Sequence, residues 1–250
     1  MDPTDVFSAK AEVYARYRWD YAPQAIQAIL DVIGVSQASS VADVGAGTGI
    51  LTRHFIGRVG QIYAVEPNAE MRQMAAQVLG DCPSCRIVDG RAEATTLPDR
   101  SVDLIVVAQS IHWFDPQPTR AEFLRILRPG GWLAILRNRG TDDELGAALG
   151  EALAGHSGPD TAPLMLGRET PRRFYYGGDE FQELIFSFTT QRAWEQFIGS
   201  LSTTSDAPDR GSPLYAGFER AARRVFERFS SGGVVASNAV TELVLGRMTC

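Results

Sequence analysis

Short apolar runs that alternate with helical repeats constrain this chain more than any other feature of its 250 residues. The runs are Val41–Val44, Ile62–Val65, Arg86–Val88, Val102–Ala108 and Trp132–Leu136. Each is almost continuously apolar, which is typical of a parallel strand covered on both faces. The segments between them carry apolar residues at helical spacing, as at Met71, Met74, Ala75 and Val78. The pattern predicts an α/β fold with a doubly wound, mostly parallel sheet and helices on both faces.

The segments before and after these runs complete a single predicted domain over residues 1–250. Residues 1–34 carry two helical stretches, Val6–Trp19 and an apolar stripe closed by Gly34, and are expected to form N-terminal helices that can act as a lid. Residues 140–182 begin with a helical pattern and become rich in Gly, Pro and Arg, which favours a cap or insertion after the fifth strand. Residues 183–250 are expected to complete a seven-stranded sheet. Its last two strands are predicted at Glu183–Thr190 and Thr241–Met248, with helices at Arg192–Leu201 and Pro213–Phe229 between them.

Composition narrows the classes of partner. The net charge of -6 argues against nucleic acid or an anionic membrane as a partner. No apolar run is long enough to cross a bilayer, and Met1–Ser8 lacks the pattern of a signal peptide, so a cytoplasmic protein is expected. Cys82 and Cys85 have the spacing of half a metal or redox site, but further ligands are scattered. We interpret this pair as part of a loop and predict no metal.

A glycine-rich turn follows the first predicted strand. The sequence Val41-Ala-Asp-Val-Gly45-Ala-Gly47-Thr-Gly49 lets a ligand approach the backbone at the carboxyl end of that strand. A dinucleotide fingerprint would continue with a third small residue where this chain has Ile50. Glu66, at the end of the second strand, is placed to accept hydrogen bonds from a ribose diol. On these two features alone, a glycine turn without a ligand stays the alternative.

A set of further motifs resembles one enzyme family. They are Gly90-Arg91-Ala92-Glu93, Leu97-Pro98-Asp99, Ser101-Val-Asp103, Gln109-Ser-Ile-His112-Trp113-Phe114-Asp115 and Leu127-Arg-Pro129-Gly130-Gly131. Their order and spacing resemble the small-molecule branch of the class I S-adenosylmethionine-dependent methyltransferases. The His-Trp-Phe-Asp segment is similar to a subgroup that includes trans-aconitate methyltransferase-like proteins. The resemblance implies a Rossmann-like fold, S-adenosyl-L-methionine as cofactor, and residues 41–139 as the cofactor-binding half.

The resemblance also implies roles for particular residues. Gly45 and Gly47 would pass beside the methionine part of the cofactor, Glu66 would hold the ribose hydroxyls, and the Ala92 backbone N–H would face the adenine. Further cofactor-binding candidates are Asp43, Ala46, Asn68, Met71, Glu93, which can substitute for an acid that relatives carry at Arg91, and Gln109, near the sulfonium. Tyr14, Tyr17 and Arg18 resemble a segment that closes over the cofactor carboxylate, for which arginine has a suitable fork geometry.

The acceptor side of the site is less defined by sequence. Methyl transfer needs orientation more than acid–base help, although a hydroxyl acceptor generally needs a base. His112 is the nearby group with a suitable ordinary pKa, and it is equally interpreted as a wall of the pocket. Tentative acceptor-binding residues are His112, Trp113, Arg139, Tyr175 and Tyr176, with a solvated surface as the alternative for Arg139 and for the tyrosines.

The sequence therefore predicts methyl transfer to the oxygen, nitrogen or carbon of a small-molecule substrate, by a monomer or a homodimer. Two alternatives stay open: non-methylating chemistry, such as that of a cyclase or decarboxylase, and a cofactor-binding module without catalysis. A nicotinamide-dependent oxidoreductase is a weaker alternative, because Ile50 does not fit its fingerprint.

Overall fold

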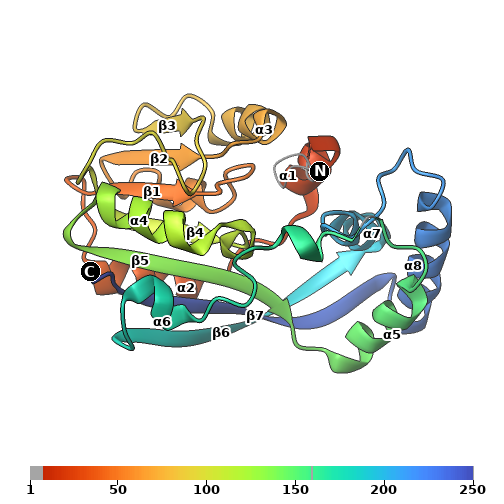
Figure 1. Cartoon of the computed structure of the whole chain (residues 1–250). Helices are drawn as coiled ribbons and strands as arrows, with labels where there is room; N and C mark the ends of the chain where they lie inside the picture. Colours follow the sequence, from red (N-terminus) through yellow and green to blue (C-terminus); the bar gives the residue numbers. More distant parts are fainter. Residues whose placement is uncertain (1–7, 159, 250) are drawn as a thin grey trace.

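The computed structural model describes residues 8–158 and 160–249 and contains one seven-stranded sheet (Figure 1). The strands are β1 Ser40–Val44, β2 Gln61–Val65, β3 Cys85–Val88, β4 Val102–Ala108, β5 Leu127–Gly140, β6 Phe181–Ala193 and β7 Val234–Arg247. Their order is β3-β2-β1-β4-β5-β7-β6. The first five pair in parallel, and β7 runs antiparallel to both of its neighbours. The predicted doubly wound, mostly parallel sheet is confirmed.

The strand order alone predicts where a ligand binds on the sheet. The chain moves outward from β1 through β2 to β3 and then returns to the other side of β1 with β4. In open α/β sheets the crevice for a ligand lies outside the carboxyl ends of the strands at such a reversal. The ends of β1 and β4, Val44 and Ala108, therefore mark the expected edge.

Helices cover both faces of the sheet. The α-helices are α1 Ala11–Tyr17, α2 Pro23–Ile33, α3 Ala69–Leu79, α4 Pro116–Ile126, α5 Asp143–Leu153, α6 Arg172–Tyr176, α7 Trp194–Ser202 and α8 Tyr215–Phe229. Phe123 and Ile126 of α4 pack in the core on one face, and Ile26 and Ile29 of α2 pack in a second core with strand residues such as Val41. The α2 helix ends as predicted at Gly34, which has a left-handed φ of 64°.

A lobe of helices lies beyond the carboxyl ends of the central strands. There α5, α7 and α8 gather around the extended ends of β6 and β7 (Figure 1). Phe197, Phe226 and Val235 form the centre of a small core that holds this lobe together. The segment 140–182 thus supplies only α5 to the lobe, while α7 and α8 come from the segment 183–250. We call α5, α7 and α8 the helical lobe.

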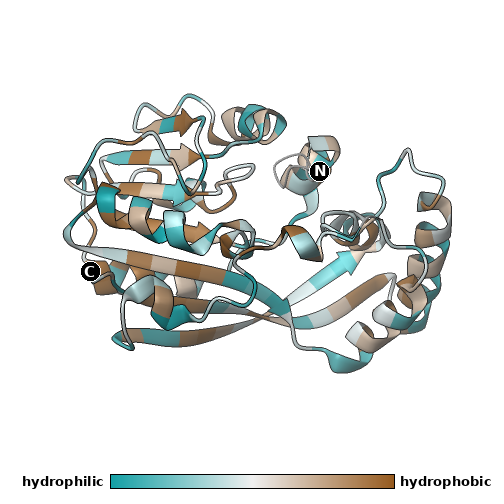
Figure 2. Cartoon of the chain, viewed as in Figure 1, coloured by the Kyte–Doolittle hydropathy of each residue, from teal (hydrophilic) through white to brown (hydrophobic). Residues whose placement is uncertain are grey.

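The hydropathy of β5 changes along its length. Figure 2 shows apolar residues along the middle of this strand and polar residues where it runs toward the helical lobe. Leu133 to Leu136 are buried, and Arg137 and Arg139 are exposed. The strand therefore passes from the core to the rim of the expected site. In the described residues, no helix is both long and apolar enough to span a membrane.

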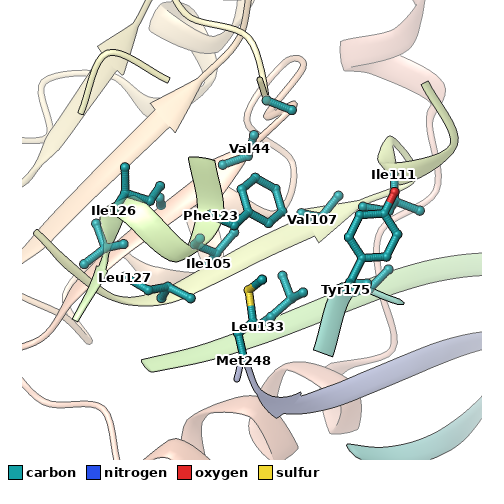
Figure 3. Close-up of a cluster of buried hydrophobic side chains, with 14 of the residues drawn as sticks. Val44, Ile105, Val107, Ile111, Phe123, Ile126, Leu127, Leu133, Tyr175 and Met248 are labelled. Atoms are coloured by element: carbon teal, nitrogen blue, oxygen red, sulfur yellow. The ribbon is translucent and has the colours of Figure 1, made fainter. Parts of the chain in front are cut away.

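Tyr175 and Tyr176, which we expected to cap the acceptor pocket, lie in the core. Tyr175 is 0% exposed and Tyr176 2%, and Figure 3 shows Tyr175 among the buried side chains between α4 and the sheet. The Tyr176 hydroxyl donates a hydrogen bond to the Val244 carbonyl at 2.9 Å. The expectation was wrong because the short helix α6 turns both rings inward, against the sheet.

Several expected boundaries also move, and β7 begins at Val234 instead of the predicted Thr241. Arg192 was predicted to begin a helix, but it lies in β6, opposite Val235, and α7 begins at Trp194. Val6, the predicted start of the first helix, lies outside the described residues, and the observed helix α1 begins at Ala11.

Candidate active site

Three cavities meet around Gln109, just after β4. They have volumes of about 480, 710 and 400 Å³, and we call them the first, second and third cavity. Gln109 lines all three. Its backbone has a left-handed φ of 58°, and its side-chain amide donates to the Asn138 carbonyl at 3.2 Å. A non-glycine residue in this strained conformation, shared by three cavities at the expected sheet edge, is typical of a functional site.

The glycine turn forms the floor of the first cavity. Gly45 has a φ of 71° and donates its backbone N–H to the Val65 carbonyl, which ties the turn to the end of β2. Gly47 has a φ of 56°, and a Cβ placed there would meet nothing within 4 Å. The backbone of Gly47 is therefore open to a ligand, as the sequence pattern predicted.

Glu66 lies beside this turn with both carboxylate oxygens held in place. Oε2 accepts the Gly47 N–H and Oε1 accepts the Asn68 N–H, both at 2.9 Å. The residue is 9% exposed, and burial raises the pKa of its carboxyl above the ordinary value. Each oxygen keeps a lone pair for a ligand, so the carboxylate can accept from two adjacent hydroxyls.

The walls of the first cavity are mostly apolar. Asn68 is the N-cap of α3, and its side chain accepts the Met71 N–H at 2.8 Å, which fixes Met71 in the wall. Ala92, Trp113 and Phe114 line the same cavity. Such walls suit the faces of a flat aromatic ring held over a carboxylate-lined floor.

Glu93 and Arg91 also line this cavity. The Glu93 carboxylate accepts the Asp115 backbone N–H at 2.9 Å and so joins the loop after β3 to the start of α4. This hydrogen bond holds two segments of the wall of the first cavity together. The use of Glu93 as an acceptor from a ligand stays a prediction.

Several residues that line the first cavity were missed. Ser110, Asp115 and Leu166 line it, and the Ser110 hydroxyl donates to the Val44 carbonyl at 3.3 Å. Ser110 and Asp115 stand in the motif that carried the resemblance, so that motif could have indicated them. Leu166 is 59% exposed and comes from the loop before α6, where no pattern marks it.

The N-terminal segment contributes Tyr14 to the first cavity, but its other predicted cofactor-binding residues, Tyr17 and Arg18, do not line that cavity. Arg18 lines the third cavity and donates to the Thr203 hydroxyl at 3.1 Å. Tyr17 donates to the Glu195 carboxylate of α7. Lys10 is buried and donates to the carbonyls of two residues that follow α7, Thr204 and Ala207. The segment therefore fastens to the helical lobe as well as covering the first cavity.

Asp43 and Ala46, which we expected in the cofactor site, lie behind it. Asp43 is buried, accepts the Thr52 hydroxyl at 2.6 Å, and has its pKa raised to about 7 by burial. Ala46 donates its backbone N–H to the Val65 carbonyl at 3.1 Å. Neither residue lines the first cavity, so both hold the shape of the turn.

His112 faces the second cavity. Burial lowers the pKa of its ring to about 4, and the charges of Arg137, Arg18, Arg168 and Arg172 act in the same direction. The imidazole is therefore neutral near pH 7. Its ring packs against Trp113, with centroids 5.2 Å apart, and Trp113 in turn lines the first cavity.

Arginines surround the second cavity. Arg137, Arg168 and Arg172 line it, and no hydrogen bond or ion pair occupies their guanidinium groups within the described residues. Arg139, the arginine that we expected to contact an acceptor, instead pairs with Glu242 at 3.0 Å. The neighbouring Arg137 takes the position that we predicted for Arg139.

No metal cluster is evident at these cavities. Within residues 8–158 and 160–249, no three His, Cys, Asp or Glu side chains gather as a metal site would require. Cys82 and Cys85 form no disulfide; Cys82 lies just before β3 and Cys85 begins it, at the sheet edge opposite the cavities.

Gly45→Ala is expected to destabilise the turn strongly. A Cβ at Gly45 would lie 2.6 Å from the Ser110 Oγ and 3.1 Å from the Phe114 ring, in addition to the cost of a left-handed φ. Gly57→Ala is the matched control, because Gly57 has a φ of 74° and open space around it. Urea unfolding should show a loss of about 1–2 kcal/mol for the control and a larger loss for Gly45→Ala. Equal losses would contradict the close packing of the turn on Ser110.

The comparisons with known proteins agree with this geometry. Residues 42–135 match the family model described as a methyltransferase domain. An uncharacterised methyltransferase of Mycobacterium tuberculosis is 37% identical over 155 residues, which cover 61% of this chain and 60% of that protein. An uncharacterised methyltransferase of Schizosaccharomyces pombe is 35% identical over 126 residues, covering 50% and 49% of the two chains.

Solved structures show the same fold over most of the chain. A protein of Anaeromyxobacter dehalogenans, assigned as a type II methyltransferase, has a TM-score of 0.62 at 24% identity and covers 92% of this chain and 98% of its own. The YcgJ protein of Bacillus subtilis has a TM-score of 0.57 at 17% identity and covers 92% and 100%.

Residues 42–135 therefore match a methyltransferase domain, and the chain has the Rossmann-like fold of solved methyltransferase structures. Domains of this class use S-adenosylmethionine as their cofactor. The match spans 60% or less of the length of the curated relatives described here. The fold indicated by the sequence motifs is confirmed, and the methyltransferase class is supported over residues 42–135, whereas the trans-aconitate subgroup stays a prediction.

Proposed function

We propose that this chain transfers a methyl group from S-adenosylmethionine to a small-molecule acceptor that carries a negative charge. The observation that carries the proposal is the junction at Gln109, where a cavity suited to the cofactor meets one lined by arginines. The methyltransferase domain match over residues 42–135 supports the reaction class.

The first cavity fits the cofactor in three respects. The open backbone at Gly47 leaves room beside the turn, the Glu66 carboxylate can accept from both ribose hydroxyls, and the apolar wall at Met71 can cover a purine. A volume of about 480 Å³ lies within the usual range of small-molecule sites. When bound, the cofactor supplies an electrophilic methyl group on a sulfonium leaving group.

The protein's own contribution is orientation and exclusion of water. Gln109 and Trp113 lie between the first cavity and the space beside His112, so they fix the line along which an acceptor approaches. Because His112 is neutral near pH 7, it can accept a hydrogen bond from an acceptor hydroxyl or amine. With a pKa of about 4 it is a weak base, which favours its role as a positioning wall.

The charge of the second cavity supports an anionic acceptor. Three arginines without carboxylate partners face it, against the two acids Asp160 and Asp206 in its lining. Guanidinium groups bind carboxylates and phosphates through paired hydrogen bonds. These positive charges would repel a cationic acceptor and offer a neutral acceptor no opposite charge to pair with.

A direct assay tests the proposed reaction. The protein is incubated with S-adenosylmethionine labelled at the methyl group and with pools of small organic acids and their neutral amides. Transfer of label to an acid, with the mass increase of one CH2, is the expected result. Cofactor binding without any labelled product would favour the binding-module alternative, and labelling of the amides alone would contradict the anionic acceptor.

His112→Asn is expected to alter acceptor affinity while leaving the pH dependence intact. Since the ring protonates only near pH 4, the rate of the unmodified protein should show no step from this group as the pH falls from 8 to 5. Profiles of kcat/KM for both proteins should therefore run parallel, with a severalfold change in KM. An acidic limb near pH 6.5 that disappears in His112→Asn would establish a general base instead.

A further inference from the structure

A buried arginine in the third cavity has no acidic partner among the residues that the structure describes. Arg192 is 7% exposed. It lies near the end of β6, where every other residue of the strand is half-buried or exposed. Its guanidinium donates to the hydroxyls of Ser200 at 3.1 Å and Ser237 at 2.7 Å. The Nε atom is buried without a hydrogen-bond partner.

The surroundings of Arg192 stabilise the guanidinium only in part. It lies over the Trp19 ring at 4.9 Å and over the Phe197 ring at 5.3 Å. Burial lowers the pKa of Arg192 to about 10. A buried cation costs several kcal/mol unless an anion pairs with it, and hydroxyl groups do not supply that charge.

The third cavity lies against this arginine. It has a volume of about 400 Å³ and lies between the N-terminal segment, the helical lobe and the ends of β5 to β7. Arg18 is a second arginine in the wall of the cavity. The cavity wall also contains the acid Asp142, whose carboxylate accepts the Leu145 N–H and so caps α5. Leu145, Leu149 and Leu201 give the cavity an apolar side.

We propose that the third cavity is a binding site for a small organic carboxylate, with its charged end at Arg192 and its apolar body against these leucines. A carboxylate supplies the missing charge for the guanidinium in a geometry that arginine recognises. The leucine side excludes a bare, strongly hydrated ion such as phosphate as the preferred ligand. This site depends on the geometry of the third cavity and not on methyl transfer.

Gly146 allows the cavity to be filled without touching Arg192. It lies in α5 and lines the cavity, and a Cβ there would meet nothing within 4 Å. Gly150, one turn later in the same helix, is also open to a Cβ but does not line the cavity. Gly146→Leu and Gly150→Leu are therefore a matched pair, since both replace a helical glycine with a better helix former.

The experiment is calorimetric titration with hexanoate in the absence of cofactor. Hexanoate is expected to bind the unmodified protein and Gly150→Leu equally, and to bind Gly146→Leu and Arg192→Met at least 10-fold more weakly. Hexanamide, which lacks the charge, should not bind. Saturating S-adenosylhomocysteine should leave hexanoate binding in place, because the product occupies the first cavity.

Several results would overturn the site. They are no hexanoate binding, equal binding of hexanamide, tighter binding of inorganic phosphate, or unchanged binding in Gly146→Leu. Displacement by S-adenosylhomocysteine would place the carboxylate in the first cavity. Weakening in Arg137→Met equal to that in Arg192→Met would place it in the second. If Arg192→Met does not fold, the glycine pair alone decides, and none of these results depends on whether methyl transfer occurs.

Discussion

Glu66→Ala is expected to weaken the binding of S-adenosylhomocysteine by about 10- to 100-fold or more. Each hydrogen bond to a charged carboxylate contributes about 1.5–3 kcal/mol, and two ribose hydroxyls would share this acceptor. The change also frees the N–H of Gly47 and of Asn68, which Glu66 holds at 2.9 Å. Calorimetry on the folded variant measures the loss.

Glu70→Ala provides the control for that experiment. Glu70 lies in the first turn of α3, close in sequence to Glu66, but does not line the first cavity. Its replacement removes one exposed hydrogen bond from the Ser8 hydroxyl and should leave affinity for the product within about twofold, because such exposed contacts contribute little. Full affinity in Glu66→Ala would remove Glu66 from the cofactor site.

Tyr175→Ala is expected to lower the free energy of unfolding by about 3–5 kcal/mol, because it empties a fully buried ring position in the core. Cofactor affinity of the folded fraction should stay unchanged, since the ring does not line the first cavity. Urea unfolding measures the loss, with Phe174→Ala as a half-buried neighbour that should lose less. A stable Tyr175→Ala with weakened acceptor binding would restore our original prediction of a cap.

The central strands could be predicted from sequence because burial on both faces leaves a continuous apolar run. Val102–Ala108 appears with the same bounds in the sequence pattern and in the structure. The glycine turn was equally readable, since the positive φ values of Gly45 and Gly47 are conformations that glycine alone adopts easily. Glu66 followed from its place at the end of β2.

The residues beyond β5 were harder to predict because their environment depends on distant segments. Tyr175 and Arg192 both carry polar groups that suggest a surface, yet both are buried, and part of the cover comes from elements far away in the sequence. Arg192 lies between Phe197, which is near it in sequence, and Trp19, which comes from the distant N-terminal segment. The arginines of the second cavity likewise come from β5 and from the loop and helix near Gly167, so no local spacing reveals them.

The attachment of α1 has a mechanical consequence. At one end Ser8 accepts a hydrogen bond from Asn68 beside the first cavity, and two residues later Lys10 is clamped to the carbonyls after α7. Residues 8–10 therefore connect the sheet to the helical lobe, so that a movement of one would be transmitted to the other. Lys10 is also the only lysine in the sequence. The rate at which an amine-reactive label modifies its Nζ would therefore report how often the hydrogen bonds to Thr204 and Ala207 open.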